Sequence, residues 1–583
     1  MGRTSFAARI IIISTILIIL FIYIAYHLYV VQIERSTELY SKAKRKYTAV
    51  KNIYGKRGEI FDVNGHLFVG NIPCSDIRAN PQLVGDKAKC RELAGYFSRK
   101  LQIEPLKIFK RLATKTINNR KIKEIVIKNA VPLDVAENIK KEIKDRGFKG
   151  IYFYDSIKRY YPKNELLSNV LGFINVDQLK VLPVSGIEKA YNSLLSPVKV
   201  QASVFERSRK GIPLTYGNNN LTEGKSGKDI YLTIDEPIQA ILEEGLNNIV
   251  EKWRPKAVYG IMVDPKTGSI LAMAQRPTFN PNDRSSMNPD SWRNRIVTDG
   301  LEPGSTMKPL IIGKALDMGI ITPDTIFDCE KGYWIYGGKR LRDSHMYEDL
   351  TVTEIVQKSS NIGTAKISLL LGKRRLFHIL RQYGFGQKTK LPFQNEATGI
   401  LRTVNRWDTL SITRFPIGQG ILVSPLQLID AYTVLAGNGK RIKLRIIDKI
   451  INKETGFEYK FPIKTEETVL QNPMTIKQII DMMKLVTKRG GTALQAAVPG
   501  YEVAGKTGTS QKWIDGAYSH SKFFASFIGF VPADDPAFIL LIIVDEPQGN
   551  HYGGVVAAPA FRNISLKTLR YLDIPETNPI DIK

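Results

Sequence analysis

Cysteine and histidine are scarce in this chain, which has only 3 cysteines and 6 histidines among its 583 residues. Cys74, Cys90 and Cys329 follow none of the spacings that bind zinc, and the histidines lie far apart. We therefore expect no metal site. An oxidising compartment would allow Cys74 and Cys90 to pair, but free thiols are the favoured state.

The chain also lacks repeats of fixed period and long low-complexity runs. Its hydrophobic content is 43% and its charged content 24%, as in ordinary globular proteins. Because 583 residues exceed what one hydrophobic core can hold, two or three domains are expected.

Charged side chains are missing from residues 10–31, a run of 22 residues that reads IIIISTILIILFIYIAYHLYVV. A helix of this length spans a bilayer core of about 30 Å. No small-residue cleavage site follows, which favours an uncleaved anchor over a secretory signal. Arg3 and Arg9 precede the run, so residues 1–9 are expected in the cytoplasm. The protein would then cross the inner (plasma) membrane once, and the rest of the chain would lie outside it, in the periplasm.

The net charge is +28, and much of it falls between residues 86 and 163, where 21 lysines and arginines face 9 acidic residues. Such a segment can bind nucleic acid. Because it is expected outside the membrane, we instead predict a basic face near anionic lipid or cell-wall polymer, with no nucleic-acid partner.

The region after the anchor alternates between strand-like and helical patterns. Residues 34–52 are polar and predicted to be helical. In residues 56–69, KRGEIFDVNGHLFV, the Asn64-Gly65 pair lies between alternating apolar positions and predicts a hairpin. Further strands are expected at 124–128 and 150–154, between basic amphipathic helices such as 105–114.

A further region begins at about residue 228. We expect a short strand at 232–234, an N-cap at Asp235, and an amphipathic helix at 236–253. Five strand-like segments flank a helix-rich middle, which runs from about 305 to 438: 257–263, 269–274, 501–512, 523–531 and 537–544. The last of them, AFILLIIV, is a continuous apolar run typical of a central buried strand. The predicted fold class is α+β, with a five-stranded antiparallel sheet against which helices pack.

Three short patterns bring chemistry to this region: Ser305-x-x-Lys308, Ser359-Ser360-Asn361 and Lys506-Thr507-Gly508. Each pattern alone is weak, because the chain contains other copies in other contexts, at Ser41-x-x-Lys44, Ser286-x-Asn288 and Lys266-Thr267-Gly268. The first set differs in its context. Ser305-x-x-Lys308 lies at a helix start, Ser359-Ser360-Asn361 lies between two helices, and Lys506-Thr507-Gly508 lies just before two apolar strands. Such places allow the side chains to meet in one cleft.

A serine hydroxyl needs a base to attack a carbonyl. No histidine lies near Ser305 in the sequence and no Gly-x-Ser-x-Gly elbow is present, so Lys308 is the candidate base. A free lysine has a pKa of about 10.4, and burial beside a second cation, Lys506, would lower it. Ser359 would pass the proton to the leaving amine and Asn361 would hold the substrate amide. The backbone N–H groups of Ser305 and Thr509 would form an oxyanion hole.

These motifs resemble those of the active-site serine penicillin-recognising enzymes. The resemblance extends from about residue 10 to 575. RGEIFDVNG, RYYPKN and SGIEKAYNSLL are similar to three boxes in the N-terminal module of class B penicillin-binding proteins. LEPGSTMKP, SSNIGTAKI, FPIGQGILVSPLQL and VAGKTGTSQK resemble the division-type branch.

The resemblance implies a peptidoglycan D-Ala-D-Ala transpeptidase that acts on pentapeptide stems in septal wall synthesis, binds β-lactams and needs no cofactor. Its implied partners are a polytopic SEDS-type glycan polymerase and other divisome membrane proteins. Thr507, Gly508 and Thr509 would bind substrate. The implied domains are a cytoplasmic tail at 1–9, an anchor at 10–31, a pedestal or dimerisation-type module at 32–227 and a transpeptidase domain at 228–575.

The sequence departs from the family pattern at Val63, Asn164, Ser196-Pro197 and Ser424. All but Ser424 fall in the N-terminal module, so they bear on its contacts rather than on the chemistry. In that module we expect Arg57, Asp62 and Glu188 to form buried charge pairs.

Four alternatives remain at the level of sequence. A side-wall, elongation-type transpeptidase would carry the same motifs. A β-lactam sensor would need a signalling domain inside the cell, where only about nine residues are expected. In one class of β-lactamases a glutamate assists hydrolysis, and no obvious counterpart is visible. A non-enzymatic scaffold would not need Ser305, Lys308 and Lys506.

Overall fold

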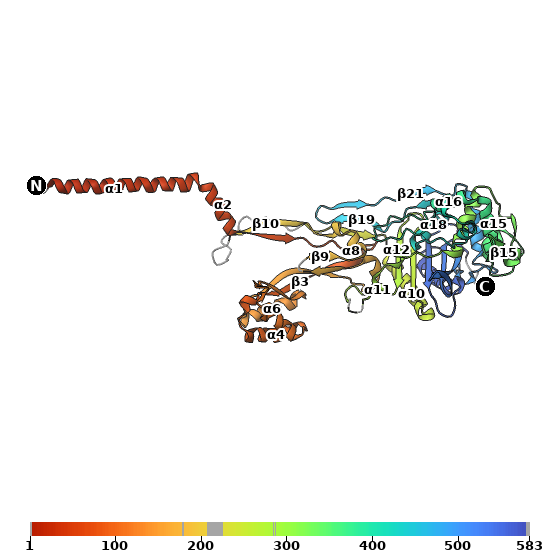
Figure 1. The fold of residues 1–583 in the computed structure, drawn as a ribbon, viewed down its shortest axis with the longest axis horizontal. Coiled ribbons are helices and arrows are strands. Elements are labelled where there is room, and N and C mark those ends of the chain that lie inside the picture. The colour runs from red at the N-terminus through yellow and green to blue at the C-terminus, as the bar shows by residue number, and fades with distance from the viewer. Residues whose placement is uncertain (1–2, 178–179, 207–224, 284, 286, 579–583) are drawn as a thin grey trace. The chain divides into compact units, whose positions relative to one another are not determined.

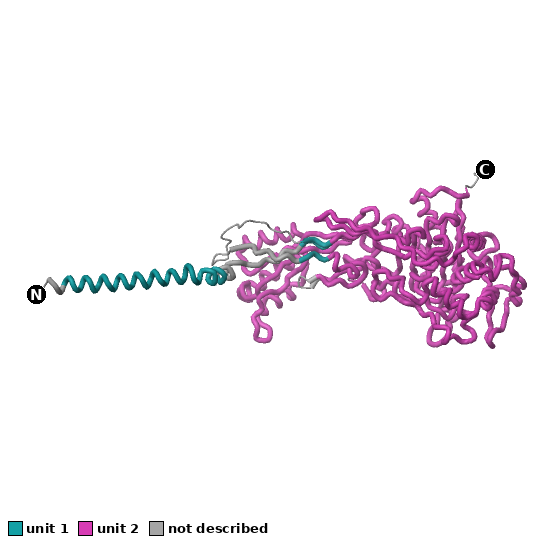
Figure 2. Tube along the Cα trace, turned by 90° about the horizontal axis from the view of Figure 1, so that it is seen from above, with its two compact units in different colours: residues 1–57, 196–227 teal, residues 58–195, 228–583 magenta. Residues whose placement is uncertain are grey.

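The computed structural model describes residues 3–177, 180–206, 225–283, 285 and 287–578. The chain divides into two units, one formed by residues 1–57 with 196–227 and the other by 58–195 with 228–583, as Figure 2 shows. The three cysteines are free and buried, which confirms the preference for free thiols.

The first unit begins with the long helix α1, Arg3–Tyr29, which continues into a π-helical turn at Val30–Glu34 (Figure 1). The helical segment Phe6–Glu34 is long and apolar enough to cross a membrane, and its most hydrophobic stretch is not buried inside the protein. The expected anchor at 10–31 lies within this segment.

A short helix and a strand pair complete the first unit. Helix α2 spans Ser36–Tyr47, and β1, Thr48–Tyr54, pairs antiparallel with β10, Lys199–Glu206. The prediction of a helix over 34–52 is therefore wrong beyond Tyr47. The reason is tertiary, because the strand partner lies about 150 residues later in the chain and gives no local signal.

The second unit opens with the predicted hairpin. Strand β2, Ile60–Phe61, pairs antiparallel with β3, Leu67–Ala79. The Asp62 carboxylate closes the turn by accepting hydrogen bonds from the backbone N–H groups of Asn64 (2.9 Å) and His66 (2.7 Å). Both β6, Ile125–Pro132, and β7, Ile151–Tyr160, pair with β3, which confirms the strands expected near 124 and 150.

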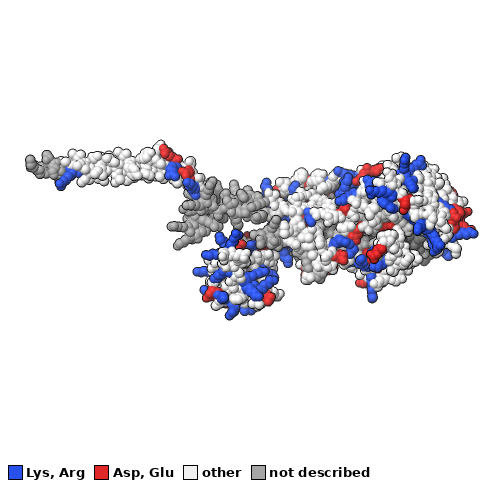
Figure 3. Space-filling view, viewed as in Figure 1, with Lys and Arg blue, Asp and Glu red and all other residues white. Residues whose placement is uncertain are grey.

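Three amphipathic helices form a lobe on these strands, with a hydrophobic core of its own. They are α4, Lys87–Leu101; α5, Pro105–Ala113; and α6, Leu133–Asp145. Figure 3 shows lysine and arginine gathered on the lobe that carries α4 and α6 in Figure 1. The basic segment of the sequence is thus largely the outer surface of this lobe.

The expected charge pairs are buried but differ in their partners. Glu188, on α8, Gly186–Ala190, pairs with Arg159 of β7 at 2.6 Å, and both side chains are buried. Asp62 is also buried and binds the His66 ring at 2.9 Å. In the first unit, buried Arg57 donates to the Ser196 hydroxyl at 3.2 Å. Removing one partner of a buried ion pair such as Arg159–Glu188 would leave an uncompensated buried charge.

The five-stranded sheet has the order β13-β12-β24-β23-β22 and is antiparallel throughout. Its strands are β12, Ala257–Val263; β13, Ile270–Arg276; β22, Ala504–Ile514; β23, Ala517–Val531; and β24, Phe538–Asp545. The apolar strand β24 is central and wholly buried, as its sequence predicts. The α+β fold class and the five-stranded sheet are confirmed.

Helices cover this sheet and form the middle of the chain. Helix α10, Glu236–Trp253, has the predicted bounds and the predicted N-cap, since Asp235 accepts from the Ile238 N–H at 3.2 Å. It packs against β13 and against α21, Ala558–Tyr571. The preceding strand β11 spans Asp229–Leu232, slightly earlier than expected, because it pairs with β2 and β19.

Between β13 and β22 lie the longer helices α13, Lys308–Asp317; α14, Val352–Lys358; α15, Asn361–Leu371; α16, Lys373–Gln382; α18, Pro425–Ala436; and α19, Pro473–Leu485. The shorter helices are α3, Pro81–Val84; α7, Ser168–Leu171; α9, Asn192–Leu195; α11, Pro289–Trp292; α12, Arg295–Thr298; α17, Ser411–Arg414; and α20, Gly553–Val556. The 3-10 turns are η2, Gly304–Met307; η3, Glu330–Gly332; η4, Val404–Arg406; η5, Phe415–Ile417; and η6, Leu494–Ala496.

The remaining strands are short: β4, Thr116–Ile117; β5, Arg120–Lys121; β8, Ile174–Asp177; β9, Lys180–Pro183; β14, Ile326–Asp328; β15, Tyr333–Tyr336; β16, Lys339–Arg342; β17, Asp349–Thr351; β18, Lys440–Ile442; β19, Ile447–Asn452; β20, Phe457–Lys460; and β21, Thr465–Thr468. One hydrophobic core joins the five-stranded sheet and the middle helices to the hairpin β2–β3, since Ile60, Phe68 and Val69 belong to it. The hairpin and the sheet region therefore fold around a common interior.

Candidate active site

Ser305 and Lys308 lie where a 3-10 turn becomes a helix. Ser305 belongs to η2, and Lys308 is the first residue of α13, with Pro309 in the first helical turn. This is the helix start that the sequence predicts, because proline is tolerated there. Ser305 is half-buried, whereas Lys308 has no exposed surface.

The Lys308 ammonium points to the second motif. Its Nζ atom donates to the Asn361 Oδ1 at 2.8 Å, to the Ser359 Oγ at 3.1 Å and to the Ser359 carbonyl. Burial lowers the pKa of Lys308 to about 7, against the opposing effect of the Asp343 charge. A lysine in this environment exchanges a proton near neutral pH, which is what a general base requires.

Ser359 and Asn361 lie at the junction of α14 and α15, as expected. Ser359 ends α14 with a left-handed backbone, at φ 61° and ψ 42°, which is unusual for a residue other than glycine. Ser360 caps α15 by accepting from the Gly363 N–H at 3.0 Å, and Asn361 donates from Nδ2 to the Arg342 carbonyl at 2.7 Å. This junction aims the Ser359 hydroxyl and the Asn361 amide oxygen at Lys308.

Lys506 reaches the same hydroxyl from the edge strand β22. Its Nζ atom lies 2.8 Å from the Ser359 Oγ and 3.3 Å from the Thr507 Oγ1. Lys506 is fully buried, and burial followed by the charge of Lys308 holds the pKa of Lys506 well below its usual range. Two buried lysines that share one hydroxyl cannot both stay charged at low cost.

Two glycines bring the strand β22 close to the turn that holds Ser305. A Cβ atom on Gly508 would clash with the Ser526 Oγ of β23 and would stand 3.0 Å from Thr306 Cγ2 and 3.1 Å from the Pro303 carbonyl. A Cβ atom on Gly304, whose φ is +59°, would stand 3.5 Å from the Thr509 nitrogen. The backbone nitrogens of Ser305 and Thr509, expected as oxyanion-hole donors, therefore belong to segments in contact.

The Ser305 hydroxyl makes no hydrogen bond within the described part of the chain. Lys308 lies on the same turn, but its ammonium donates to Ser359 and Asn361. The structure thus brings together Lys308, Ser359, Asn361 and Lys506 in one network and leaves the Ser305 oxygen open beside it. An open hydroxyl is accessible to an incoming carbonyl.

Sequence reasoning missed two carboxylates at this site. Asp343 accepts from the Ser360 hydroxyl at 2.6 Å, from the Ile362 N–H at 3.1 Å and from the Asn361 N–H, so it holds the second motif in place. Nothing in RLRDSH distinguishes this aspartate, because its role arises only from the fold.

Glu302 is the other carboxylate, three residues before Ser305. It accepts from the Gly420 N–H at 2.7 Å and from the Tyr518 hydroxyl at 3.0 Å, and burial raises its pKa. It ties the turn before Ser305 to the 415–420 segment and to β23. The one sequence feature that could have identified Glu302 is its position directly before Pro303-Gly304-Ser305.

The other Lys-Thr-Gly copy behaves as an ordinary turn. The Lys266 side chain is 56% exposed and pairs with Asp535 at 2.6 Å, away from the four-residue network. Among the residues that the structure describes, no group of three histidine, cysteine or acidic side chains forms a metal-binding cluster.

Two family models match this chain. The model described as the penicillin binding protein transpeptidase domain matches residues 258–566, and the model described as the penicillin-binding protein dimerisation domain matches residues 52–232. The first contains all three motifs of the site, and the second contains the hairpin β2–β3 and the helical lobe.

Similar proteins cover most of the chain. The "Probable peptidoglycan D,D-transpeptidase PenA" of Neisseria meningitidis is 32% identical over 526 residues, which are 90% of this chain and 86% of that protein. The peptidoglycan D,D-transpeptidase FtsI of Escherichia coli is 30% identical over 533 residues, 90% of this chain and 85% of that one. Among solved structures, penicillin binding protein 2X of Streptococcus thermophilus superposes with a TM-score of 0.74 at 23% identity, over 90% of this chain and 80% of that chain.

Proposed function

Because this chain belongs to the class B penicillin-binding proteins and is a peptidoglycan D,D-transpeptidase, we propose that it cross-links septal wall through an acyl-enzyme on Ser305. The observation that carries the site assignment is the network of Lys308, Ser359 and Lys506 around one hydroxyl, beside the open Ser305. The septal role rests on the resemblance of the motifs to the division-type branch.

The proposed reaction has two halves. Neutral Lys308 takes the proton of the Ser305 hydroxyl, whose oxygen forms a bond to the carbonyl carbon of the penultimate D-Ala. The bond to the terminal D-Ala breaks, and the Ser359 hydroxyl, backed by Lys506, delivers a proton to the departing amine. An acceptor amine then attacks the ester and loses a proton to the same groups, which frees Ser305.

Substrate is held by groups around this network. Asn361 and the backbone of β22 at Thr507, Gly508 and Thr509 would bind the stem-peptide backbone. The N–H groups of Ser305 and Thr509 would stabilise the oxyanion, an effect worth about 3 kcal/mol or more per donor in related acyl transfers. A β-lactam would enter by the same route, because its amide mimics the D-Ala-D-Ala bond.

The domain boundaries predicted from the sequence, 32–227 for the pedestal module and 228–575 for the catalytic domain, are part of this proposal. So is the membrane orientation, with residues 1–9 in the cytoplasm and the catalytic domain outside. The helix α1 would bind a polytopic SEDS-type glycan polymerase and so recruit the enzyme to the divisome. Within this helix the Thr15 hydroxyl donates its hydrogen to the Ile11 carbonyl at 2.8 Å.

Mass spectrometry of the full-length protein after incubation with penicillin tests the site. The adduct is expected on the peptide that contains Ser305, with slow release of the drug. Ser305→Ala should abolish labelling and keep the fold, since the Ser305 hydroxyl caps neither η2 nor α13. Lys308→Ala should stop acylation nearly as completely, because serine and base act as a unit. Lys506→Ala should slow the acylation of Ser305. An adduct elsewhere, or rapid turnover of penicillin, would contradict the assignment.

The septal role and the partner are tested in cells that depend on this gene product. Depletion should give filaments, whereas spheres would assign a side-wall role. Replacement of residues 10–31 by an unrelated spanning helix should keep penicillin labelling but fail to restore division. Full rescue by that chimera would reject the proposal that α1 recruits the polymerase.

A further inference from the structure

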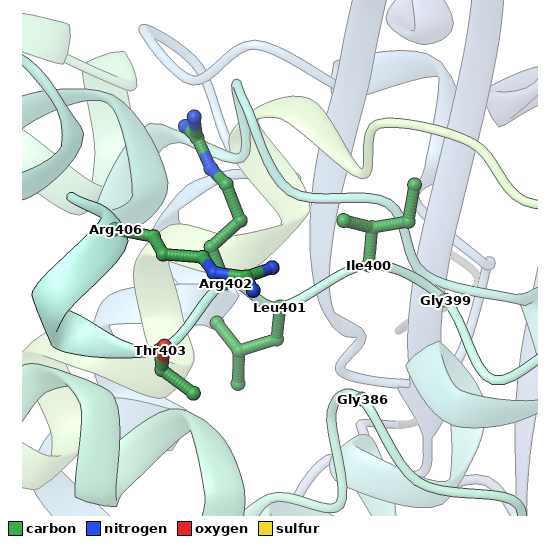
Figure 4. A pocket seen from close by; sticks show the side chains of 7 residues that line it. All are labelled: Gly386, Gly399, Ile400, Leu401, Arg402, Thr403 and Arg406. Atoms are coloured by element: carbon green, nitrogen blue, oxygen red, sulfur yellow. The ribbon is translucent and has the colours of Figure 1, made fainter. Parts of the chain in front are cut away.

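A second cavity opens on the segment that follows α16. Its volume is about 460 Å³, and its lining includes Gly386, Leu401, Arg402, Thr403 and Arg406. In Figure 4 the Arg406 guanidinium reaches toward Leu401, while the Arg402 side chain extends away from it. The cavity has none of the three motifs in its lining.

Two arginines line this cavity, Arg402 and Arg406. Arg381 lies next to it and donates to the carbonyl of Gly386, one of the lining residues, at 3.1 Å. Within the described residues, none of the three forms an ion pair. Arg402 helps to lower the pKa of the nearby Asp408 carboxyl. The Asp408 Oδ1 atom, however, accepts hydrogen bonds from the Ser411 N–H and hydroxyl, both at 2.7 Å. The Arg402 guanidinium lies over the Phe415 ring, 5.6 Å from its centroid, whereas Arg406 reaches toward Leu401 and has no charged partner among the described residues, which favours an anion in the cavity.

The cavity is coupled to the active site through the backbone. Ile400 pairs with Leu422, and the adjacent Val423 pairs with Leu301, four residues before Ser305. Since antiparallel neighbours lie about 5 Å apart, the cavity is about 10 Å from the chain that leads into Ser305. The Arg402 guanidinium also approaches Gly420, whose N–H binds Glu302.

We propose that the arginine cavity is a subsite for a free carboxylate of the stem peptide, located about three residues before the bond that is cleaved. This inference rests on the proposed function. An extended peptide advances about 3.4 Å per residue, so three residues cover about 10 Å, which matches the separation between the cavity and the chain that leads into Ser305. Arginine binds carboxylates through two parallel hydrogen bonds, and the half-exposed Ile400 offers apolar contact beside them.

The test is the protection of Ser305 against a fluorescent penicillin, measured on the full-length protein in detergent. Two synthetic stem pentapeptides compete with it, one with a free carboxylate on its second residue and one with that carboxylate amidated. On the unmodified enzyme the free acid should protect at concentrations about tenfold lower than the amide. On Arg406→Ala the two peptides should protect equally, and Arg406→Lys should fall between because lysine lacks the paired donors.

Arg374→Ala is the matched control, since Arg374 is an exposed arginine on α16 outside the cavity, and it should keep the tenfold difference. Equal protection by the two peptides on the unmodified enzyme, or protection by neither, would overturn the subsite. Binding of inorganic diphosphate that depends on Arg406, with no difference between the peptides, would also overturn it and assign the cavity to a phosphate ligand. A failure of penicillin to label Ser305 would instead contradict the proposed function.

Discussion

Two lysines without exposed surface determine the chemistry at the scale of single residues. Lys308 and Lys506 both lie within hydrogen-bond distance of the Ser359 hydroxyl, so the charge of each disfavours the charge of the other. Burial supplies the larger effect on both pKa values. A residue that is ordinarily a surface cation becomes a base here because it has lost its water.

The rate of acylation should therefore depend on pH through Lys308. A lysine whose pKa is lowered to about 7 is charged below that value and neutral above it. Penicillin acylation of Ser305 should rise with pH through about 7 and then level off. Single-turnover labelling across neutral pH measures this profile, and a rate that does not vary with pH would contradict the role of Lys308.

Asp343→Asn should shift that profile to lower pH. The Asp343 charge raises the pKa of Lys308, so its removal lowers the pKa further, while the asparagine oxygen can still accept from the Asn361 and Ile362 N–H groups. The midpoint of the acylation profile reports the change. Asp349→Asn, an exposed aspartate on β17, serves as the control and should leave the midpoint in place.

Ser359 offers a test of backbone strain separate from chemistry. Ser359→Gly and Ser359→Ala both remove the hydroxyl, so both should lose acylation. Only glycine adopts the left-handed backbone of this position without strain, and Ser359→Gly should be more stable than Ser359→Ala by about 1 kcal/mol. Denaturant unfolding compares the two variants, and equal stabilities would mean that the junction relaxes.

At the scale of elements, the site depends on the close approach of β22 to the turn η2. The residue that permits it is Gly508, which has no room for a side chain among the Ser526 hydroxyl, Thr306 and the Pro303 carbonyl. The junction of α14 and α15 supplies the opposite wall. Three elements distant in sequence therefore set the position of Ser305 relative to its partners.

Gly508→Ala should separate β22 from η2 and slow acylation about a hundredfold, since a displacement of about 1 Å has that effect on reacting groups. Gly516→Ala is the control. Gly516 lies at the turn between β22 and β23, and an added Cβ atom there would have no neighbour within 4 Å, so this variant changes the same strand pair without crowding η2. It should acylate at the normal rate although its positive φ costs some stability. Labelling rates at matched fractions of folded protein make the comparison, and equal rates for the two variants would show that the approach is not required.

At the scale of the second unit, the pedestal and the sheet region share one hydrophobic core. Ile60, Phe68 and Val69 of the hairpin pack in the same cluster as Ile230 and Leu232, and β2 pairs with β11. The helical lobe has a separate core. The N-terminal module is thus two structures, a lobe with its own interior and a base built into the catalytic part.

A fragment of residues 228–578 should therefore be less stable than residues 58–578. Its loss of the hairpin exposes several core side chains, each worth about 1.5–3 kcal/mol, and a thermal midpoint lower by about 10 °C or more is expected. Calorimetry compares the two fragments. Deletion of the lobe helices alone, which leaves the shared core intact, should have the smaller effect, and the reverse order would contradict this division.

The sequence by itself determined the local elements and the inventory of the site. The anchor, the strand β24, helix α10 with its cap, and the three motifs follow from apolar periodicity, capping residues and residue spacing within short windows. Only the tertiary structure decided that Asp343 supports Asn361, that Thr48–Tyr54 is a strand, and that Gly386 lies beside Arg402 and Arg406 at one cavity. These features depend on contacts between residues far apart in the chain, and such contacts leave no periodic or local signal for a sequence to carry.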